Sequence, residues 1–212
     1  MTVAKLKPHF KEESGFRQQG FSLIAGVDEA GRGALAGPVV AGAVILGQSR
    51  KSGWLKDVND SKLLSARIRD ELYLFITTEA ITFGIGIVSH SYIDTYGIVP
   101  ATRLAMKLAV SELTPDPEAL LIDYLSLPEI ALPQKGIING DAVCVSIACA
   151  SIIAKVARDR LMSSLDARFP GYKLGIHKGY GTAEHLECLN RNGPCNIHRR
   201  SFAPVKSLRS LF

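Results

Sequence analysis

The sequence predicts a single α/β domain in which a mixed β-sheet is flanked by helices. Apolar runs of strand length alternate along the chain with longer segments of helical periodicity, which is the order expected of a layered α/β fold. The 212 residues include 47% hydrophobic and 21% charged side chains, a balance that fits one domain with a substantial core. No internal repeat, low-complexity tract or long linker interrupts the alternation.

The first half of the chain contains three predicted strands and one predicted helix. The strands are the apolar runs at 23–27, 39–46 and 81–88. The helix extends from about residue 65 to residue 80, with Ser65 as its N-cap. Its predicted core stripe consists of four apolar residues at helical spacing, Ile68, Leu72, Phe75 and Ile76.

The second half continues in the same way. A helix is expected to begin near Pro100 and to stop before Pro115. Two short strands should follow, one ending in Asp123 and one, from Gly136 onward, ending in Gly140-Asp141. A last helix should begin after Thr182, whose hydroxyl can cap it, and end at Gly193-Pro194.

The longest helical pattern in the chain lies between these elements, at about 146–168. Its predicted buried side consists of Cys149, Ile152, Ile153, Val156 and Ala157. Its predicted polar side consists of Ser151, Lys155, Arg158 and Asp159.

Charge is unevenly distributed along the chain. The formal net charge is +5, and the segment 188–212 contains five Lys or Arg residues and no acid. A basic terminal segment favours a polyanionic partner such as nucleic acid. Residues 1–20 lack the apolar core of a signal peptide, and the longest apolar run, 39–46, is too short to span a bilayer, so we expect a cytoplasmic protein.

The four cysteines do not resemble a disulfide framework, and none forms a C-x-x-C pair, so reduced thiols are expected. Two short motifs nevertheless have ligand types that could bind zinc, His185-x-x-Cys188 and Cys195-x-x-His198. Against zinc, Cys188 continues the apolar side of the last predicted helix. Core packing is therefore the favoured interpretation of Cys188.

Acidic residues end several of the predicted strands. Asp28 and Glu29 follow the apolar run 23–27, and Asp123 and Asp141 end two later runs. Each acid alone could serve a turn, but in open α/β sheets side chains at the same end of neighbouring strands meet. Asp28 and Glu29 can share a site only if the strand breaks between or after them, because successive strand side chains point to opposite faces. The segment 30–33 provides that break.

Four carboxylates without nearby Cys or His favour an oxygen-seeking cation such as Mg²⁺ or Mn²⁺. Two such ions can activate water and stabilise the leaving oxygen of a phosphodiester. Gly31-Arg32-Gly33 lacks the glycine spacing of a Walker loop or a Rossmann fingerprint. Its glycines allow close backbone approach, and its arginine can bind phosphate. Hydrolysis of a nucleic acid backbone is the leading prediction.

Motifs along most of the chain, from about Ile24 to Lys206, resemble ribonuclease HII, the bacterial type 2 ribonuclease H family. The matching blocks are Gly26-Val27-Asp28-Glu29-Ala30-Gly31-Arg32-Gly33, Leu35-Ala36-Gly37-Pro38, Asn59-Asp60-Ser61-Lys62, Leu121-Ile122-Asp123, Gly140-Asp141, Ser146-Ile147-Ala148, Ala154-Lys155-Val156-Ala157-Arg158-Asp159, His177-Lys178-Gly179-Tyr180 and His198-Arg199-Arg200-Ser201-Phe202.

The resemblance implies a ribonuclease H-like catalytic domain at 21–170, preceded by an N-terminal segment (1–20) and followed by a basic, helical extension (171–212) packed on the same domain. It implies a monomeric, metal-dependent endonuclease that cuts the RNA strand of RNA–DNA hybrids and single ribonucleotides in duplex DNA, leaving 3′-hydroxyl and 5′-phosphate ends.

Residue roles follow from the same resemblance. The metal ligands and catalytic residues would be Asp28, Glu29, Asp123 and Asp141. The loop that senses the ribose 2′-hydroxyl would be Gly31, Arg32 and Gly33. Tyr180 would pack against the nucleotide at the RNA-to-DNA junction. Three lysines are candidate phosphate contacts, or else ordinary solvated charges, Lys62, Lys155 and Lys178.

Three positions depart from the family pattern. Tyr124 follows the third acid where the family usually has Gly, Asn139 stands where a Lys commonly precedes Gly-Asp, and Leu63 replaces the second Lys of N-D-S-K-K. Catalysis with altered affinity or metal preference is expected. The segment 206–212 lacks the leading Gln of a clamp-binding peptide and is not interpreted as one. The competing functions are a protein that binds RNA–DNA duplex without cutting it and a metal-dependent nuclease of other specificity.

Overall fold

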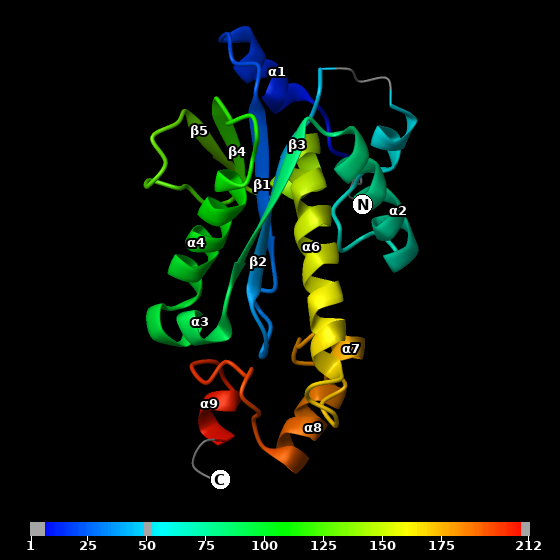
Figure 1. Ribbon diagram of the computed structural model, residues 1–212, viewed down its shortest axis with the longest axis vertical. Helices are drawn as coiled ribbons and strands as arrows, with labels where there is room; N and C mark the ends of the chain where they lie inside the picture. The colour runs from blue at the N-terminus through cyan, green and yellow to red at the C-terminus, as the bar shows by residue number, and fades with distance from the viewer. Residues whose placement is uncertain (1–6, 49–51, 209–212) are drawn as a thin grey trace, which may run out of the picture.

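The computed structural model describes residues 7–48 and 52–208. A twisted sheet lies at the centre, with α4 against one face and α6 against the other, and the helices of the C-terminal extension lie beyond one end of α6 (Figure 1). The elements in chain order are α1 (Lys11–Gln18), β1 (Ile24–Ala30), β2 (Val39–Ile45), the 3₁₀ helix η1 (Gly53–Asp57), α2 (Ala66–Glu79), β3 (Thr82–Val88), α3 (His90–Tyr96), α4 (Ile98–Ser111), β4 (Ala119–Asp123), β5 (Gln134–Ile137), α5 (Gly140–Val143), α6 (Val145–Asp166), α7 (Leu174–His177), α8 (Ala183–Asn192) and α9 (Val205–Leu208).

The sheet is mixed, with the strand order β3-β2-β1-β4-β5. β1 pairs antiparallel with β2 and parallel with β4, and β4 pairs parallel with β5. The predicted class, an α/β fold with a mixed sheet flanked by helices, is confirmed. Because β1 and β4 are parallel neighbours with Val27 opposite Ile122, their carboxyl ends lie side by side. This pairing positions the acids described below.

Glycines in the strands allow the two covering helices to approach the sheet closely. A Cβ on Gly26 would overlap the backbone of Ser146 in α6, and a Cβ on Gly86 would overlap the carbonyl of Ala105 in α4. Fully buried apolar side chains fill both interfaces, one between the sheet and α4 and one between the sheet, α6 and α2. The core is therefore two apolar layers on either side of β1 and β2.

Most predicted elements are present at nearly the expected bounds. Ser65 caps α2, and Thr182 caps α8 by accepting a hydrogen bond from the amide of His185 at 3.3 Å. α4 begins two residues before Pro100, which lies in its first turn. The helices α1, α3, α5, α7 and α9 have no counterpart among the predicted elements, since each is short.

Two predictions about helix faces are wrong in part. Ile68 and Phe75 are 40% and 46% exposed, because α2 packs against α6 on the outside of the molecule and buries Leu72 and Ile76 but not the rest of the stripe. On α6, Ser151 and Arg158 of the predicted polar side are buried. The reason is that other segments cover this side, with Ser61 contacting Ser151 and the loops around Pro38 and Lys178 covering Arg158.

The prediction that Asp141 ends a strand is also wrong. β5 ends at Ile137, Asn139 takes a left-handed backbone conformation with φ 54°, and Asp141 lies in the short helix α5. Within residues 7–48 and 52–208, no helix has both the length and the apolar character needed to cross a membrane.

Candidate active site

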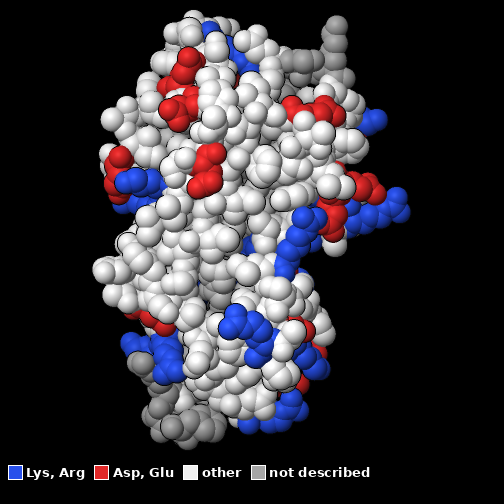
Figure 2. All heavy atoms as spheres, in the orientation of Figure 1, with Lys and Arg blue, Asp and Glu red and all other residues white. Residues whose placement is uncertain are grey.

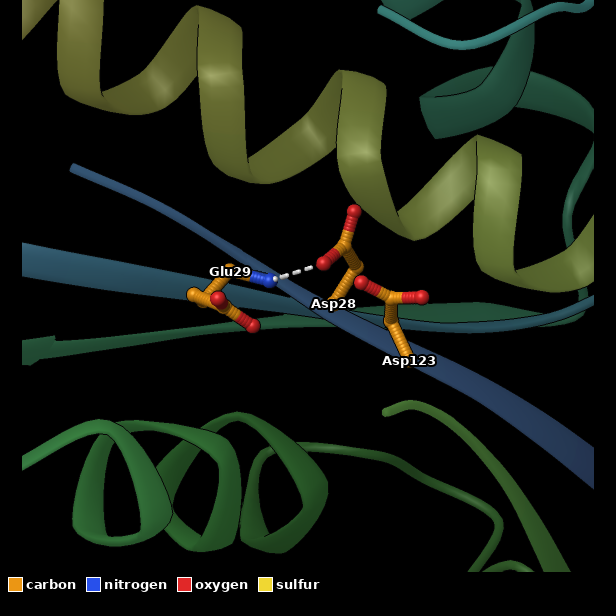
Figure 3. Close-up of side chains that lie close together, drawn as sticks. All are labelled: Asp28, Glu29 and Asp123. Carbon is orange, nitrogen blue, oxygen red and sulfur yellow. Dashed lines mark hydrogen bonds between the residues drawn. The ribbon is translucent and has the colours of Figure 1, made fainter. Parts of the chain in front are cut away.

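Three acids meet at the carboxyl ends of β1 and β4. Asp28 and Glu29 come from β1, and Asp123 is the last residue of β4. One carboxylate oxygen from each lies within 4.8 Å of the others, and Figure 3 shows the three side chains at the end of β1. β1 continues through Ala30, so the chain departs from the strand after the two acids rather than between them. Asp28 also accepts a hydrogen bond from the amide of Glu29 at 2.7 Å.

The acid cluster carries negative charge that nearby protein groups only partly balance. Burial raises the pKa of Asp28 well above its ordinary value, and Glu29 and Asp123 raise it further. Burial likewise raises the pKa of Glu29, against the opposing effect of Arg32, whose guanidinium lies 3.3 Å from it. Burial is also the main cause of the raised pKa of Asp123. Carboxylates kept close together in this way are stabilised by a bound cation.

A second observation shows that the residues fit a hard divalent cation. The Oε2 atom of Glu29 is buried and has no hydrogen-bond partner in the described part of the chain. All three side chains of the cluster offer oxygen, which Mg²⁺ and Mn²⁺ prefer over the nitrogen and sulfur ligands of zinc sites. The cluster is therefore a candidate centre for a divalent metal.

Asp141 lies next to this cluster without joining the group of three. Its Oδ2 accepts a hydrogen bond from Nζ of Lys62 at 3.1 Å. Burial acts to lower the pKa of Lys62, but the charge and hydrogen bond of Asp141, together with the charges of Asp60 and Asp28, raise the pKa above the ordinary value. The preceding amide, of Gly140, donates to Asp123 at 2.6 Å and so connects α5 to the end of β4.

A cavity of about 480 Å³ opens over the acids. Its lining residues include Asp28, Glu29, Asp123, Gly31, Arg32, Gly33, Lys62, Lys155 and Tyr180. Nζ of Lys155 lies 5.5 Å from the ring centre of Tyr180 and 2.7 Å from Asp159. The structure thus brings most of the sequence-derived site residues to one concave surface.

Lys178 does not line this cavity. Its Nζ donates to Ser163 and to the carbonyl of Gly175, and it lies in a neighbouring groove of about 330 Å³ that also contains Arg160. In Figure 2, Lys and Arg atoms are prominent on the lower half of the visible face, and several acids lie on the upper half.

Three arginines that help to build the site are not among the residues that the sequence predicts for it. Arg69 lines the cavity, and its guanidinium donates to the carbonyls of Ser61 and Leu64. Arg158 and Arg199 are fully buried and donate to backbone carbonyls around the Gly-Arg-Gly loop. Arg158 and Arg199 stand in motifs already noted, but no sequence pattern indicates that an arginine is buried against carbonyls.

The two histidines of the possible zinc motifs contact each other, and His198 also contacts Cys195. Nε2 of His185 and Nε2 of His198 lie 3.0 Å apart, and Nδ1 of His198 accepts from the amide of Cys195 at 3.0 Å. Cys188 is buried in the apolar core of the extension. In the described residues the acid cluster is the one group with three potential ligand atoms close together. The predicted core packing of Cys188 is confirmed.

An α/β sheet with clustered carboxylates at the ends of adjacent strands, beside a glycine-rich loop in a cavity lined by cations, defines the class of divalent-metal-dependent nucleases. Comparison with known proteins specifies the family. The family model described as "Ribonuclease HII" matches residues 25–205, and the chain belongs to the ribonuclease HII family, whose members are ribonucleases H.

Curated relatives agree over nearly the whole chain. A ribonuclease HII of Dehalococcoides mccartyi strain BAV1 is 59% identical over 208 residues, which is 98% of each chain. A ribonuclease HII of Chloroflexus aurantiacus is 50% identical over 200 residues, covering 93% of this chain and 94% of the relative.

Solved structures share the fold. The ribonuclease H2 of Pyrococcus horikoshii has a TM-score of 0.72 at 24% identity, covering 89% of this chain and 97% of that one. The structure of the PCNA:RNase HII complex from Archaeoglobus fulgidus has a TM-score of 0.71 at 26% identity, covering 84% of this chain and 93% of the matched chain. The predicted ribonuclease H-like fold and the predicted family are confirmed.

Proposed function

We propose that this protein hydrolyses the RNA strand of RNA–DNA hybrids and incises duplex DNA at single embedded ribonucleotides, leaving 3′-hydroxyl and 5′-phosphate ends. The observation that carries the proposal is one cavity that holds both the acid cluster and the Gly-Arg-Gly loop. The acids account for phosphodiester chemistry, and the loop lies close enough to read the sugar next to the bond that is cut. Relatives that are 50–59% identical and named ribonuclease HII support it.

The metal ligands in this proposal are Asp28, Glu29 and Asp123, with Asp141 as a fourth. A pair of Mg²⁺ or Mn²⁺ ions held there would supply Lewis-acid stabilisation and a water activated at neutral pH. A structural relative at 21% identity and TM-score 0.68 is titled as Bst-RNase HIII in complex with Mn²⁺, which supports Mn²⁺ as one candidate. The chain's own contribution is to hold the carboxylates close together at rigid strand ends.

The remaining site residues bind and orient the substrate. Backbone groups of the loop 31–33 can meet both the donor and the acceptor of a ribose 2′-hydroxyl, the group that separates RNA from DNA. The Tyr180 ring, which lies against Lys155 and Arg158, offers a surface for a sugar or base. Lys62 and Lys155 line the cavity, where their charges can attract phosphate, and Lys178 lies in the adjoining groove.

The proposal extends to the cellular compartment and the oligomeric state. All four cysteines are free thiols, which supports function in a reducing compartment such as the cytoplasm.

A monomer is proposed from the family resemblance, and light scattering of the purified protein tests it. The Archaeoglobus relative was solved with PCNA, but a clamp is not proposed as a partner, since residues 206–212 lack the leading Gln and 209–212 lie outside the described residues.

One assay tests the function against its alternatives. The protein is incubated with Mg²⁺ or Mn²⁺ and each of three duplexes, an RNA–DNA hybrid, a DNA duplex with one ribonucleotide, and the all-DNA equivalent. Cleavage of the first two with 3′-hydroxyl products is expected. Equal cleavage of all three would show a nuclease of other specificity, and binding without cleavage would show a duplex-binding protein.

A further inference from the structure

Arg199 is a fully buried cation, although it belongs to the basic C-terminal segment that charge alone assigns to nucleic acid. Among the residues that the structure describes, its guanidinium donates to three backbone carbonyls and to no carboxylate. The acceptors are the oxygens of Gly37 at 3.0 Å, Arg32 at 2.7 Å and Gly31 at 2.7 Å. Two of the three belong to the Gly-Arg-Gly loop, which lies about 170 residues earlier in the sequence.

The backbone around Arg199 is fixed against the segment that follows the loop. The amide of Arg199 donates to Leu35 at 2.8 Å, and the amide of Gly37 donates to Ile197 at 2.9 Å. Ala36 and His198 form an antiparallel bridge between these contacts. The guanidinium also lies 5.1 Å from the ring centre of Phe202. Arg199 therefore reaches the loop from a rigid position.

The two loop carbonyls belong to the peptide groups that carry the amides of Arg32 and Gly33. In a trans peptide the N–H points opposite the C=O, so carbonyls held by Arg199 direct both amides away from it. Within residues 7–48 and 52–208, neither amide donates to a protein acceptor. Gly31, Arg32 and Gly33 all line the cavity over the acids. The loop thus presents two unused donors at the site.

A buried guanidinium without a carboxylate is costly to maintain. Burial, reinforced by the nearby charge of Arg158, lowers the pKa of Arg199 to about 9. Hydrogen bonds donated by a buried guanidinium are strong because the donor is charged and water is excluded. The positive charge also polarises the peptide groups whose carbonyls receive these bonds. Polarisation makes the opposite N–H a better donor.

We propose that Arg199 is a positioning residue for recognition of the 2′-oxygen: its guanidinium fixes and polarises the two peptide groups whose N–H groups contact the ribose. The proposal rests on the proposed function and extends it, because it assigns part of the sugar specificity to the C-terminal extension. Arg199 itself contacts neither substrate nor metal.

The test compares Arg199→Lys with a matched control, Arg67→Lys, which makes the same change at an exposed arginine paired with Glu71. Lysine keeps the charge but lacks the planar fork that reaches three carbonyls. The substrates are a duplex with one ribonucleotide and the same duplex with a 2′-fluoro nucleotide there, which keeps the ring but is a weak acceptor. The measured quantity is the ratio of kcat/KM for the two duplexes.

Arg199→Lys should lower this ratio at least tenfold, while Arg67→Lys leaves it unchanged. The affinity for Mn²⁺, measured by calorimetry, should be the same in both variants and the wild type, because β1 and β4 position the acids. An unchanged ratio in folded Arg199→Lys overturns the proposal, because a merely structural role slows both substrates alike. If the wild type cleaves no ribonucleotide-containing duplex, the proposed function fails instead.

A second measurement does not depend on the folding of any variant. The guanidinium ¹⁵N signals of Arg199 in the wild-type protein are recorded at saturation with each duplex in the presence of Ca²⁺. A larger shift with the ribonucleotide than with the 2′-fluoro nucleotide is expected, since a hydrogen bond to the amides strengthens the opposite carbonyls as acceptors. Equal shifts would contradict the coupling.

Discussion

Gly31 is the position where a single methyl group should disrupt the candidate site most. Its φ is +94°, a backbone conformation that residues with a Cβ rarely adopt, and a Cβ there would overlap the guanidinium of Arg158. Forcing a non-glycine residue into such a conformation costs about 1–2 kcal/mol. Overpacking a filled interior costs about 1–3 kcal/mol more.

Gly31→Ala should therefore lower the free energy of unfolding by roughly 2–5 kcal/mol. Since 1 kcal/mol shifts Tm by roughly 2–4 °C in a domain of this size, a fall of roughly 4–20 °C is expected. Thermal denaturation followed by circular dichroism measures it. Displacement of Arg158, which holds the carbonyls of Ala36, Pro38 and Lys178, should also reduce cleavage.

The matched control lies two residues away in the same loop. A Cβ on Gly33 meets no atom within 4 Å, and its φ lies outside the left-handed region. Gly33→Ala should thus keep Tm within about 2 °C of the wild type. Equal Tm values for the two variants would show that neither the positive φ nor the packing against Arg158 constrains residue 31.

Three further predictions concern the acids, the loop arginine and the buried histidines. Asp28→Asn should abolish most cleavage and weaken Mn²⁺ binding while raising the Tm of the metal-free protein; because the pKa of Asp28 is raised in the folded state, the wild type should lose stability relative to this variant as pH rises above about 4. Undiminished turnover in this variant would show that Asp28 has no catalytic role. Arg32→Ala should lower cleavage with a smaller effect on Tm, since among the described residues its guanidinium forms a hydrogen bond and ion pair with Glu29 alone; a protein unfolded at ordinary temperature would show that the side chain is structural. Burial, with His185 adding to it, lowers the pKa of His198 to about 4, so the unfolded chain binds the extra proton first and stability should fall by up to roughly 3 kcal/mol as pH drops from about 6.5 to 4. Denaturant titrations of the wild type and His198→Gln at several pH values measure the free energy of unfolding. An equal loss of stability at low pH in both proteins would show that His198 does not cause it.

Patterns local in sequence predicted much of the fold. The apolar runs gave β1, β2, β3 and β4, and the caps at Ser65 and Thr182 gave the starts of α2 and α8. Short helices such as α3 and α5 were not predicted, because a single turn or two has too few residues for a periodic signal. The sequence pattern predicts a strand that ends at Asp141, but Asn139 takes a left-handed backbone conformation and turns the chain into α5.

Burial of polar residues was the least predictable property. Arg158 and Arg199 look like surface cations in the sequence, and each is buried because several carbonyls from distant loops surround its guanidinium. Ser151 is buried because Ser61 lies against it. No local pattern encodes these partners.

The sequence by itself determined the chemistry of this protein: the types of acid that can hold a metal, the glycine loop beside them, the strand and helix periodicities, and the family. The tertiary structure decided which of those groups meet. Parallel pairing of β1 with β4 brings Asp123 to Asp28 and Glu29, and the turn at Asn139 keeps Asp141 at the margin beside Lys62. Only the folded chain places Arg199 behind the loop 31–33, because hydrogen bonds between segments about 170 residues apart depend on the packing of the whole domain.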